Sequence, residues 1–230
     1  MLDIPAGAGG ESARLAQMGF RVFSIDLFPP LADTPATRWV RADCNAPLPF
    51  RTGAFDAVLS REGIEHFENQ AGFMRECARV LRPGGRIVVT TPNVMHLSAR
   101  LSAMLTGQRT MRRGLVNEVE TLRARSGSRF YHGHAFLIDY FRLRYMMRLA
   151  GFGEIEAHTD RFSPSSLALA PMIPLMYAAS RLSVIAFARK ARQHRRAMAP
   201  AELTAEMIGH VFSPALLFGK RMIVTALRES

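Results

Sequence analysis

Short apolar runs alternate with helical patterns along the first part of the chain. The runs at residues 2–4, 21–25, 39–42, 55–60 and 86–90 predict five strands. Residues 11–18 predict a short helix, and residues 70–81 predict an amphipathic helix that carries Phe73 and Cys77 on one face. Strands that alternate with helices in this way predict an α/β fold, with a mostly parallel sheet covered on both faces.

The remainder of the chain is less regular and contains a long interruption. We predict helices over residues 94–105 and 137–149, strands over 153–158 and 221–227, and a Gly/Arg-rich connection over 106–129 that includes a short helix. About sixty residues separate the last two strands, which is too long for a hairpin loop and predicts an inserted helical subdomain. The predicted organisation is a core of residues 1–159, an insertion at 160–220 and a last core strand at 221–230.

Composition divides the chain into a neutral part and a basic part. With 230 residues, 48% of them hydrophobic, the chain can bury a sizeable core in one large domain. The formal net charge is +11, but ten Arg and ten acidic residues cancel within residues 1–93, so the excess lies in residues 94–230. Cys44 and Cys77 are too few for a disulfide scaffold, and no secretory signal opens the chain. These features favour a reducing, cytoplasmic location.

Three features stand where predicted strands end, which is the edge at which open parallel sheets bind ligands. A loop with Gly7, Gly9 and Gly10 follows the first strand, Asp26 follows the second and Asp43 follows the third. Glycines let a ligand approach the backbone closely. Asp26 can accept hydrogen bonds from both hydroxyls of a ribose, and Asp43 can accept one from the exocyclic amine of adenine. The ordered set predicts a nucleoside cofactor.

A nicotinamide dinucleotide is the main alternative cofactor. Its G-x-G-x-x-G pattern, anchored on Gly7 and Gly9, requires glycine at position 12, where this chain has Ser12. The two closing strands also fit a hairpin-ended sheet better than a second mononucleotide-binding half. The pattern therefore disfavours a nicotinamide cofactor.

Several segments, taken in order, resemble class I S-adenosylmethionine (SAM)-dependent methyltransferases. They are LDIPAGAGGES, ADCNAPLPFRTGAFDAVLS, EGIEHF, ARVLRPGGRIVVTTPN and HAFLIDYFRLRYMMRLAGF. The resemblance implies a Rossmann-like seven-stranded sheet in the order 3-2-1-4-5-7-6, with the last strand antiparallel. It also implies the cofactor-binding residues. Asp3, Gly7 and Gly9 would line the methionine end of SAM, and Asp26 would bind the ribose. Asp43 and Cys44 would contact the adenine, and Ser60 would border the sulfonium.

The resemblance also implies a difference at the N-terminus. The family has a complete first strand, preceded by a helix that covers the cofactor, whereas Met1 of this chain falls within that strand. We therefore expect an N-terminally short core, explained either by a start further upstream or by weaker cofactor binding.

The segment from Arg61 to His66 has the form E-x-x-E-H. If a helix begins here, Glu62 and Glu65 share one face and His66 lies beside them. The segment is similar to that of ubiquinone-pathway O-methyltransferases, and the resemblance implies that the three side chains hold a divalent ion such as Mg²⁺. Such an ion would lower the pKa of a phenolic acceptor. The alternative is that Glu65 and His66 pack and cap the helix without a metal.

Catalysis of methyl transfer consists mainly of positioning. A hydroxyl or amine acceptor also needs a base with a pKa near neutrality. His66 is the first candidate, and His134 is the second because the corresponding segment of the family borders the active site. The alternative for either histidine is a structural role.

The predicted insertion combines an apolar stretch with a basic end. Residues 168–188 are apolar apart from Arg181, and five of the next eight residues, 189–196, are basic. An apolar stretch followed by cations fits an element at an anionic membrane surface. Pro171 and Pro174 are expected to break the stretch into a hairpin.

Three interpretations of the insertion stay open, namely a membrane-surface element, a lid or homodimer surface, and a nucleic-acid-binding surface. The apolar centre at residues 167–179 is short for a spanning helix, so we expect an interfacial, re-entrant or buried segment. RNA binding is disfavoured because the basic run lacks interleaved aromatic residues. The segment HVFSPALLFGKRMIV resembles methyltransferases of lipid and cell-envelope pathways, which implies a lipid-like acceptor.

Taken together, the sequence predicts a SAM-dependent methyltransferase that acts on a small or lipid-like acceptor at oxygen. Its expected location is the cytoplasm, at the inner face of a membrane. Two alternatives stay open. One is an RNA methyltransferase that uses the basic surface, and the other is a catalytically silent module that keeps the fold to bind a membrane or a partner.

Overall fold

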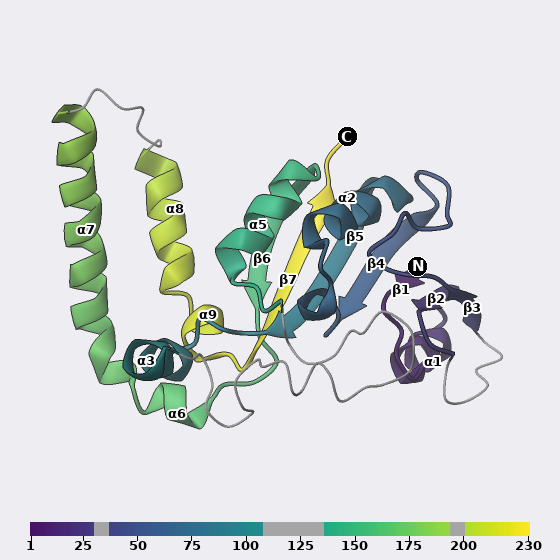
Figure 1. The fold of residues 1–230 in the computed structure, drawn as a ribbon, viewed down its shortest axis with the longest axis horizontal. Helices are drawn as coiled ribbons and strands as arrows, with labels where there is room; N and C mark the ends of the chain where they lie inside the picture. The colour runs from purple at the N-terminus through teal and green to yellow at the C-terminus, as the bar shows by residue number, and fades with distance from the viewer. Residues whose placement is uncertain (30–36, 108–135, 194–200) are drawn as a thin grey trace.

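Seven strands form one sheet in the computed structural model, which describes residues 1–29, 37–107, 136–193 and 201–230. The strand order is β3-β2-β1-β4-β5-β7-β6 (Figure 1). Neighbouring strands pair in parallel except that β7 is antiparallel to both β5 and β6. The sheet implied by the sequence resemblance is therefore confirmed.

The elements follow the alternating pattern of the sequence. The strands are β1 (Leu2–Asp3), β2 (Val22–Asp26), β3 (Thr37–Arg41), β4 (Phe55–Arg61), β5 (Leu81–Pro92), β6 (Phe152–His158) and β7 (Arg221–Arg228). The helices of the core are α1 (Gly10–Gln17), η1 (Ile64–His66), α2 (Gln70–Val80), α3 (Leu97–Thr106) and α5 (Tyr140–Leu149). Between β6 and β7 stand α6 (Pro164–Leu167), η2 (Ala170–Met172), α7 (Ile173–Gln193), α8 (Ala201–Val211) and α9 (Pro214–Phe218).

The core helices begin at capping side chains and bury apolar stripes. The Asn69 side chain accepts a hydrogen bond from the Gly72 N–H at 2.9 Å at the start of α2, which buries Phe73 and Cys77. Asp139 caps α5 in the same way. The two helices contact each other, and α2 packs on β5 while α5 packs on β6, as Figure 1 shows. The amphipathic helix predicted at residues 70–81 is thus confirmed.

Two segments differ from the prediction. Strand β5 begins at Leu81 rather than at residue 86, because Leu81 pairs with Phe55 before the register shifts. The expected proline-broken hairpin is wrong. Pro171 lies in the first turn of η2 and Pro174 is the second residue of α7, where a helix does not need the missing N–H. The prolines therefore begin these helices and leave α7 continuous.

The helices between β6 and β7 are joined to the core through a narrow neck. The Ser163 N–H donates to the Phe218 carbonyl at 2.7 Å, and the Lys220 N–H donates to the Arg161 carbonyl at 3.1 Å. Because β6 runs antiparallel to β7, this neck lies where β6 ends and β7 begins. That edge of the sheet also carries the carboxyl ends of the other parallel strands.

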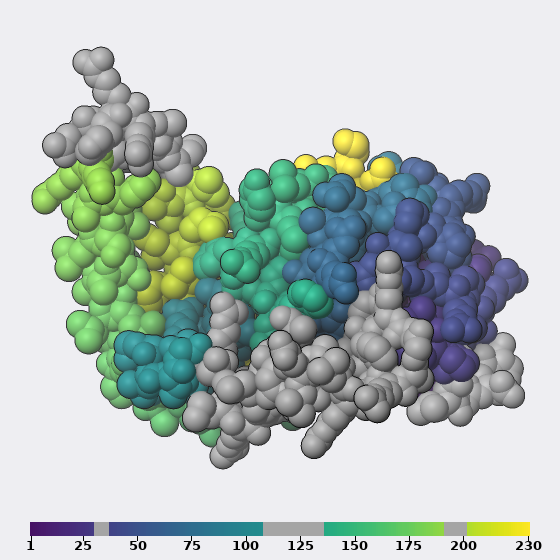
Figure 2. Space-filling model, viewed as in Figure 1, coloured from purple at the N-terminus to yellow at the C-terminus, as the bar shows by residue number. Residues whose placement is uncertain are grey.

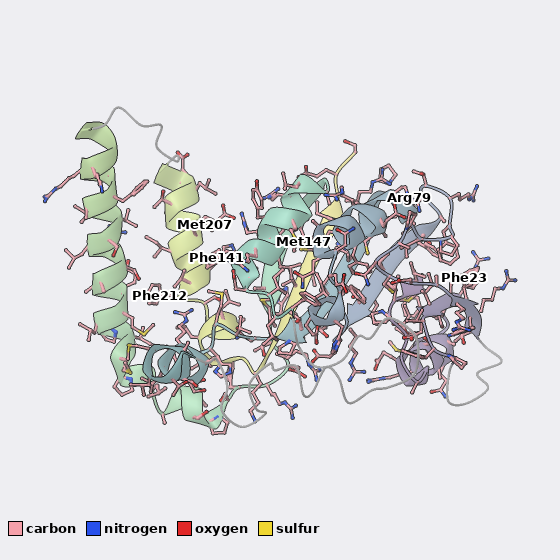
Figure 3. The ribbon with its side chains drawn as sticks, in the orientation of Figure 1. Phe23, Arg79, Phe141, Met147, Met207 and Phe212 are labelled. Carbon is pink, nitrogen blue, oxygen red and sulfur yellow. The ribbon has the colours of Figure 1, made fainter. Side chains whose placement is uncertain are left out.

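Helix α8 is attached to α5 by a buried cation. Arg144 of α5 donates from Nη2 to Glu206 Oε1 of α8 at 2.6 Å, and its Nη1 lies 3.3 Å from His210 Nε2. Arg144 is buried, and its hydrogen bond holds the pKa of Glu206 below the usual range. Figure 3 shows Phe141 of α5 and Met207 of α8 in the space between these two helices. Helix α8 is thus fixed to the core by both charge and packing.

Helix α7 stands beyond α8, on the far side from the sheet (Figure 1). Its Tyr177 ring packs edge-on against Phe212, with 5.2 Å between the ring centroids. Within the described residues, Ala170–Lys190 is the stretch long and apolar enough to cross a membrane by length and composition, and none of it is buried. Of the three expected kinds of segment, the buried one is therefore excluded, and the interfacial and re-entrant ones stay open.

Candidate cofactor site

A glycine loop follows β1 at the carboxyl edge of the sheet. Gly7 and Gly9 have φ values of 55° and 85°, in the left-handed region that favours glycine. Gly9 is also the N-cap of α1, so the N–H groups of the first helical turn lie at the loop. A Cβ placed on Gly7 meets no atom within 4 Å. The space beside this backbone is therefore open to a ligand.

Asp26 lies at the end of β2 and is fixed by the backbone on both sides. Its Oδ2 accepts a hydrogen bond from the Gly7 N–H at 2.8 Å, and its Oδ1 accepts one from the Phe28 N–H at 3.0 Å. Each carboxylate oxygen keeps a further lone pair for a ligand. The glycine loop and the predicted ribose-binding carboxylate thus form one rigid unit.

A small cavity adjoins this unit. It has a volume of about 150 Å³ and brings together the predicted site residues Asp26, Asp43, Cys44 and His66. The remaining lining residues are Pro5, Leu27, Phe28 and Phe67. Asp43 is oriented by the Asn45 N–H, which donates to Oδ1 at 2.9 Å. The cavity therefore combines carboxylates for hydroxyl or amine groups with apolar walls for a flat ring.

The apolar walls were not singled out by the sequence. Leu27 and Phe28 follow directly after Asp26, and Phe67 follows His66, so each neighbours a predicted site residue. Their position next to predicted site residues is the one sequence feature from which these lining residues could have been predicted. Burial raises the pKa of the Cys44 thiol, which keeps this thiol protonated beside the two carboxylates.

Asp3 lies beneath the glycine loop, where Ser12 donates a hydrogen bond to its Oδ2. Ser24 donates in turn to Ser12 at 2.8 Å, so the chain of hydrogen bonds joins β1, α1 and β2. Burial raises the pKa of Asp3 to about 6, although the Ser12 hydrogen bond acts in the opposite direction. The assignment of Asp3 to the methionine end of the cofactor stays a prediction.

Two buried polar atoms near the ends of β4 and β5 lack a hydrogen-bond partner within the described part of the chain. They are Ser60 Oγ and Glu65 Oε1. The other carboxyl oxygen of Glu65 accepts a hydrogen bond from Thr91 Oγ1 at 3.0 Å. Burial, supported by the negative charge of Glu62, raises the pKa of Glu65 to about 7. Sequence reasoning did not single out Glu65 as a carboxyl group that titrates near neutrality.

The structure does not bring the predicted metal ligands Glu62, Glu65 and His66 together, and their metal-binding role stays a prediction. Across the described ranges, no group of three or more His, Cys, Asp or Glu residues is placed to hold a metal ion. Glu62 has a φ of 47° and lies outside η1, so the helical spacing that would align it with Glu65 does not exist. Its Oε1 pairs with Arg221 Nε at 3.2 Å, while Glu65 turns toward Thr91 and His66 borders the cavity.

The two predicted catalytic histidines have different outcomes. His66 borders the same cavity as Asp26, so the structure brings it next to the predicted cofactor residues. Its role as a base stays a prediction. His134 lies outside the described residues, as does the Gly/Arg-rich connection before it.

We expect Gly7→Ala to reduce ligand binding more than it reduces stability. The left-handed conformation costs an alanine about 1–2 kcal/mol, while the added methyl group enters the open space beside the loop. Titration calorimetry with S-adenosylhomocysteine and a thermal unfolding curve measure the two effects separately. Gly19→Ala is the matched control, because Gly19 also has a positive φ (90°) and open space at its Cβ position but lies past the other end of α1. Equal affinities for the two variants would contradict the open-loop assignment.

Comparison with known proteins agrees with the fold. Residues 2–89 match the family described as "Methyltransferase domain". Over 95 residues the chain is 36% identical to a demethylmenaquinone methyltransferase of Tropheryma whipplei, which covers 39% of this chain and 40% of that protein. Over 102 residues it is 31% identical to a ubiquinone biosynthesis O-methyltransferase of Xanthomonas oryzae pv. oryzae, with 40% and 43% covered. The chain thus spans about two fifths of the length of these relatives.

A solved structure extends the likeness in fold over the whole chain. It is phosphoethanolamine N-methyltransferase 2 of Haemonchus contortus in complex with S-adenosyl-L-methionine. The TM-score is 0.53 at 18% identity, with all of this chain and 48% of that chain covered. The sheet and the glycine loop are those of a Rossmann-like fold, which this chain shares with solved methyltransferases. The sequence match to the methyltransferase domain family covers residues 2–89.

The described residues fit SAM as the cofactor. A Cβ would fill the open space at Gly7, Asp26 presents oriented carboxylate oxygens, and the apolar cavity begins beside Asp43 and Cys44. In this arrangement the glycine loop and Asp26 would hold the amino-acid and ribose parts, and the cavity would hold the base.

Proposed function

We propose that the protein transfers the methyl group of SAM to an oxygen of a small, apolar, quinone-like or lipid-like acceptor. The observation that carries the proposal is the meeting of the glycine loop, Asp26, Asp43 and Cys44 around one cavity at the carboxyl edge of the sheet. Similarity to enzymes named for ubiquinone and demethylmenaquinone supports a quinone-type acceptor.

The residues of this chain contribute mainly by orientation. SAM, when bound, supplies a methyl group attached to a positively charged sulfur, and this sulfur is a good leaving group. Asp26 is held rigid by two backbone N–H groups, so it can bind a ribose without first being ordered. His66 is the candidate to accept the proton of a hydroxyl acceptor, which requires the acceptor to reach the rim of the cavity that would hold the adenine. Positioning of this kind can contribute roughly 7–11 kcal/mol to catalysis.

A thermal-shift titration with S-adenosylhomocysteine tests the cofactor part of the proposal. Ligand at 100 times its Kd should add about 2.7 kcal/mol to the free energy of unfolding. For a chain of this size, we expect Tm to rise by roughly 5–10 °C. An unchanged Tm at saturating ligand would contradict methyl transfer and would favour the catalytically silent alternative.

An assay with methyl-labelled SAM tests the acceptor. We expect label in a phenolic quinone precursor and none in unmodified transfer RNA. Label in RNA would instead support the alternative of an RNA methyltransferase that uses the basic surface. Label on carbon or nitrogen of the small acceptor would contradict the oxygen assignment while leaving the cofactor assignment intact.

A further inference from the structure

Helix α7 presents an apolar stripe that no described part of the chain covers. Leu175, Ala178, Leu182 and Ile185 repeat at helical spacing and therefore share one face. Leu175 is 72% exposed and Leu182 is 66% exposed. Figure 2 shows the arm that α7 forms at one end of the molecule, away from the sheet. Large contiguous apolar surfaces of this kind mark interaction sites.

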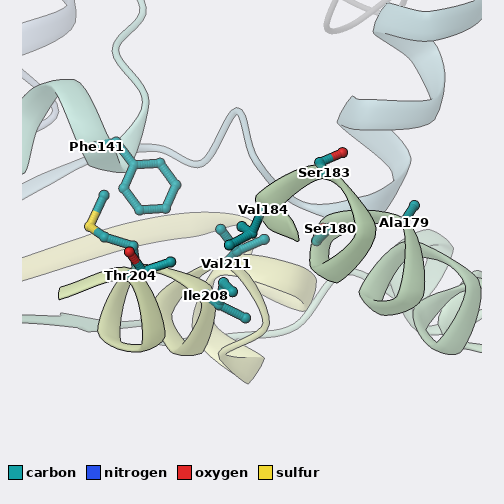
Figure 4. Close-up of a pocket in the computed structure, with 9 residues that line it drawn as sticks. Phe141, Ala179, Ser180, Ser183, Val184, Thr204, Ile208 and Val211 are labelled. Atoms are coloured by element: carbon teal, nitrogen blue, oxygen red, sulfur yellow. The ribbon is translucent and has the colours of Figure 1, made fainter. Parts of the chain in front are cut away.

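The opposite side of α7 faces α8 and is only loosely packed. Ser180, Ser183 and Val184 of α7 line a groove with Met207 and Ile208 of α8 (Figure 4). The groove has a volume of about 490 Å³. Since α8 lies on this side, the stripe from Leu175 to Ile185 points away from the protein.

Exposed apolar side chains continue at the foot of α7. Met104 and Leu105 of α3 are exposed, and so is Leu167 of α6, which contacts α3. Figure 1 places α3 and α6 at the end of α7 that adjoins the carboxyl edge of the sheet. The apolar surface thus extends from the outer helix toward the edge that carries the cofactor site.

Charge along this region has one sign. No acidic residue lies between Asp160 and Glu202 in the sequence, whereas five of the residues 189–196 are basic. Arg189 follows Ile185 by one helical turn and is exposed, so the apolar stripe ends at a cation. An apolar stripe with a basic end complements lipid tails beside anionic headgroups. The same segment of a second copy of this chain contains no acidic residue, so it has no carboxylate to pair with these cations.

The way the insertion is attached to the core limits how α7 can be placed in a bilayer. Both ends of the insertion meet at the neck of Arg161, Ser163, Phe218 and Lys220. A chain that leaves and returns at one place crosses a membrane an even number of times. Helix α8 has 11 residues, which span about 16 Å, and a bilayer core is about 30 Å thick. Since α8 is also bound to Arg144, no described segment can provide the second crossing.

We propose that α7 lies in the plane of an anionic lipid surface, with the stripe from Leu175 to Ile185 in the apolar layer and Arg189 at the headgroups. This lipid-binding surface goes beyond the proposed methyl transfer and does not depend on it. It places the carboxyl edge of the sheet close to a membrane from which an apolar acceptor could be taken.

Flotation of the full chain with vesicles tests the proposal. We expect binding to phosphatidylcholine vesicles that contain 30% phosphatidylglycerol and much weaker binding to phosphatidylcholine alone. The double variant Leu175→Glu/Leu182→Glu should weaken binding at least a hundredfold, and Arg181→Gln/Arg189→Gln at least tenfold. Met18→Glu is the matched control, because Met18 is 65% exposed at the C-cap of the distant helix α1. It should bind as the parent does.

Three results would overturn the proposal. The first is failure of the parent chain to bind anionic vesicles. The second is unchanged binding of Leu175→Glu/Leu182→Glu while the Arg variant loses binding, because the surface would then attract any polyanion, RNA included. The third is a dimer in solution that these Glu substitutions dissociate, together with no vesicle binding, because the stripe would then be a self-association surface.

Depth measurements test the orientation of α7. Single cysteines at positions 175, 182 and 189 can carry a fluorophore, since the native Cys44 and Cys77 are buried. Quenchers placed along the lipid chains should report one shallow depth for 175 and 182 and a headgroup position for 189. A label at 182 near the bilayer centre would show a spanning helix and overturn the in-plane assignment.

Discussion

Substitution of Asp26 by Asn should weaken S-adenosylhomocysteine binding at least a hundredfold, which corresponds to about 2.7 kcal/mol. The carboxylate is the group oriented by Gly7 and Phe28, and an amide leaves only one oxygen to accept hydrogen bonds. Each hydrogen bond to a charged group contributes about 1.5–3 kcal/mol, so the loss of one or two accounts for the effect. Titration calorimetry on purified protein measures it.

The same substitution should lower stability by a smaller amount, because one of the two backbone N–H groups loses its acceptor. We expect a decrease of about 1–2 kcal/mol in the free energy of unfolding of the ligand-free protein. Asp56→Asn is the control. Asp56 lies near the start of β4, at the opposite edge of the sheet, and is exposed. If Asp26→Asn bound the ligand with parent affinity, the ribose assignment would be refuted.

Substitution of Glu65 by Gln should stabilise the protein above neutral pH. Burial raises the pKa of this carboxyl group to about 7 in the folded protein, from 4.5 in the unfolded chain. The folded state therefore retains a proton that the unfolded state releases as pH rises above 4.5. Stability falls between pH 4.5 and 7 and stays lower above pH 7. At 1.36 kcal/mol per pKa unit, the loss is about 3 kcal/mol.

A neutral glutamine removes this loss and keeps an acceptor for Thr91. We expect equal stabilities of parent and variant at pH 4, and a variant Tm higher by roughly 6–12 °C at pH 8. Thermal unfolding followed at both pH values gives the comparison. Glu68→Gln, at an exposed position three residues away, should show no such difference between the pH values. Parallel pH profiles for parent and Glu65→Gln would rule out the buried carboxyl as the cause.

The positions of Asp26 and Asp43 could be predicted because they depend on local pattern. Asp26 ends strand β2 and Asp43 follows strand β3, and parallel strands end at the same edge of a sheet. The contact of Asp26 with Gly7 could not be read in this way, because it depends on the pairing of β1 with β2. That contact depends on the strand order. The strand order could be predicted only from the family resemblance and not from local pattern.

The helical spacing expected for the E-x-x-E-H segment is wrong for a backbone reason. The pattern assumed α-helical spacing, but Glu62 adopts a left-handed conformation and η1 contains a single 3₁₀ turn. Side-chain directions are then set by the two backbone dihedral angles of one residue, which sequence spacing does not encode. Likewise, Pro171 and Pro174 are compatible with a broken helix and with the beginning of one. Tertiary structure selects the second.

The neck at Ser163 and Phe218 has a consequence for folding. β6 and β7 are neighbours in the sheet, yet the whole insertion lies between them in the chain. Compared with a four-residue hairpin, a loop of this length is about four doublings longer, so closing it costs on the order of 2 kcal/mol more chain entropy. The short hydrogen bonds of the neck offset part of that cost. We therefore expect pairing of the last strand to be a late step in folding, and shortening of the insertion to accelerate it.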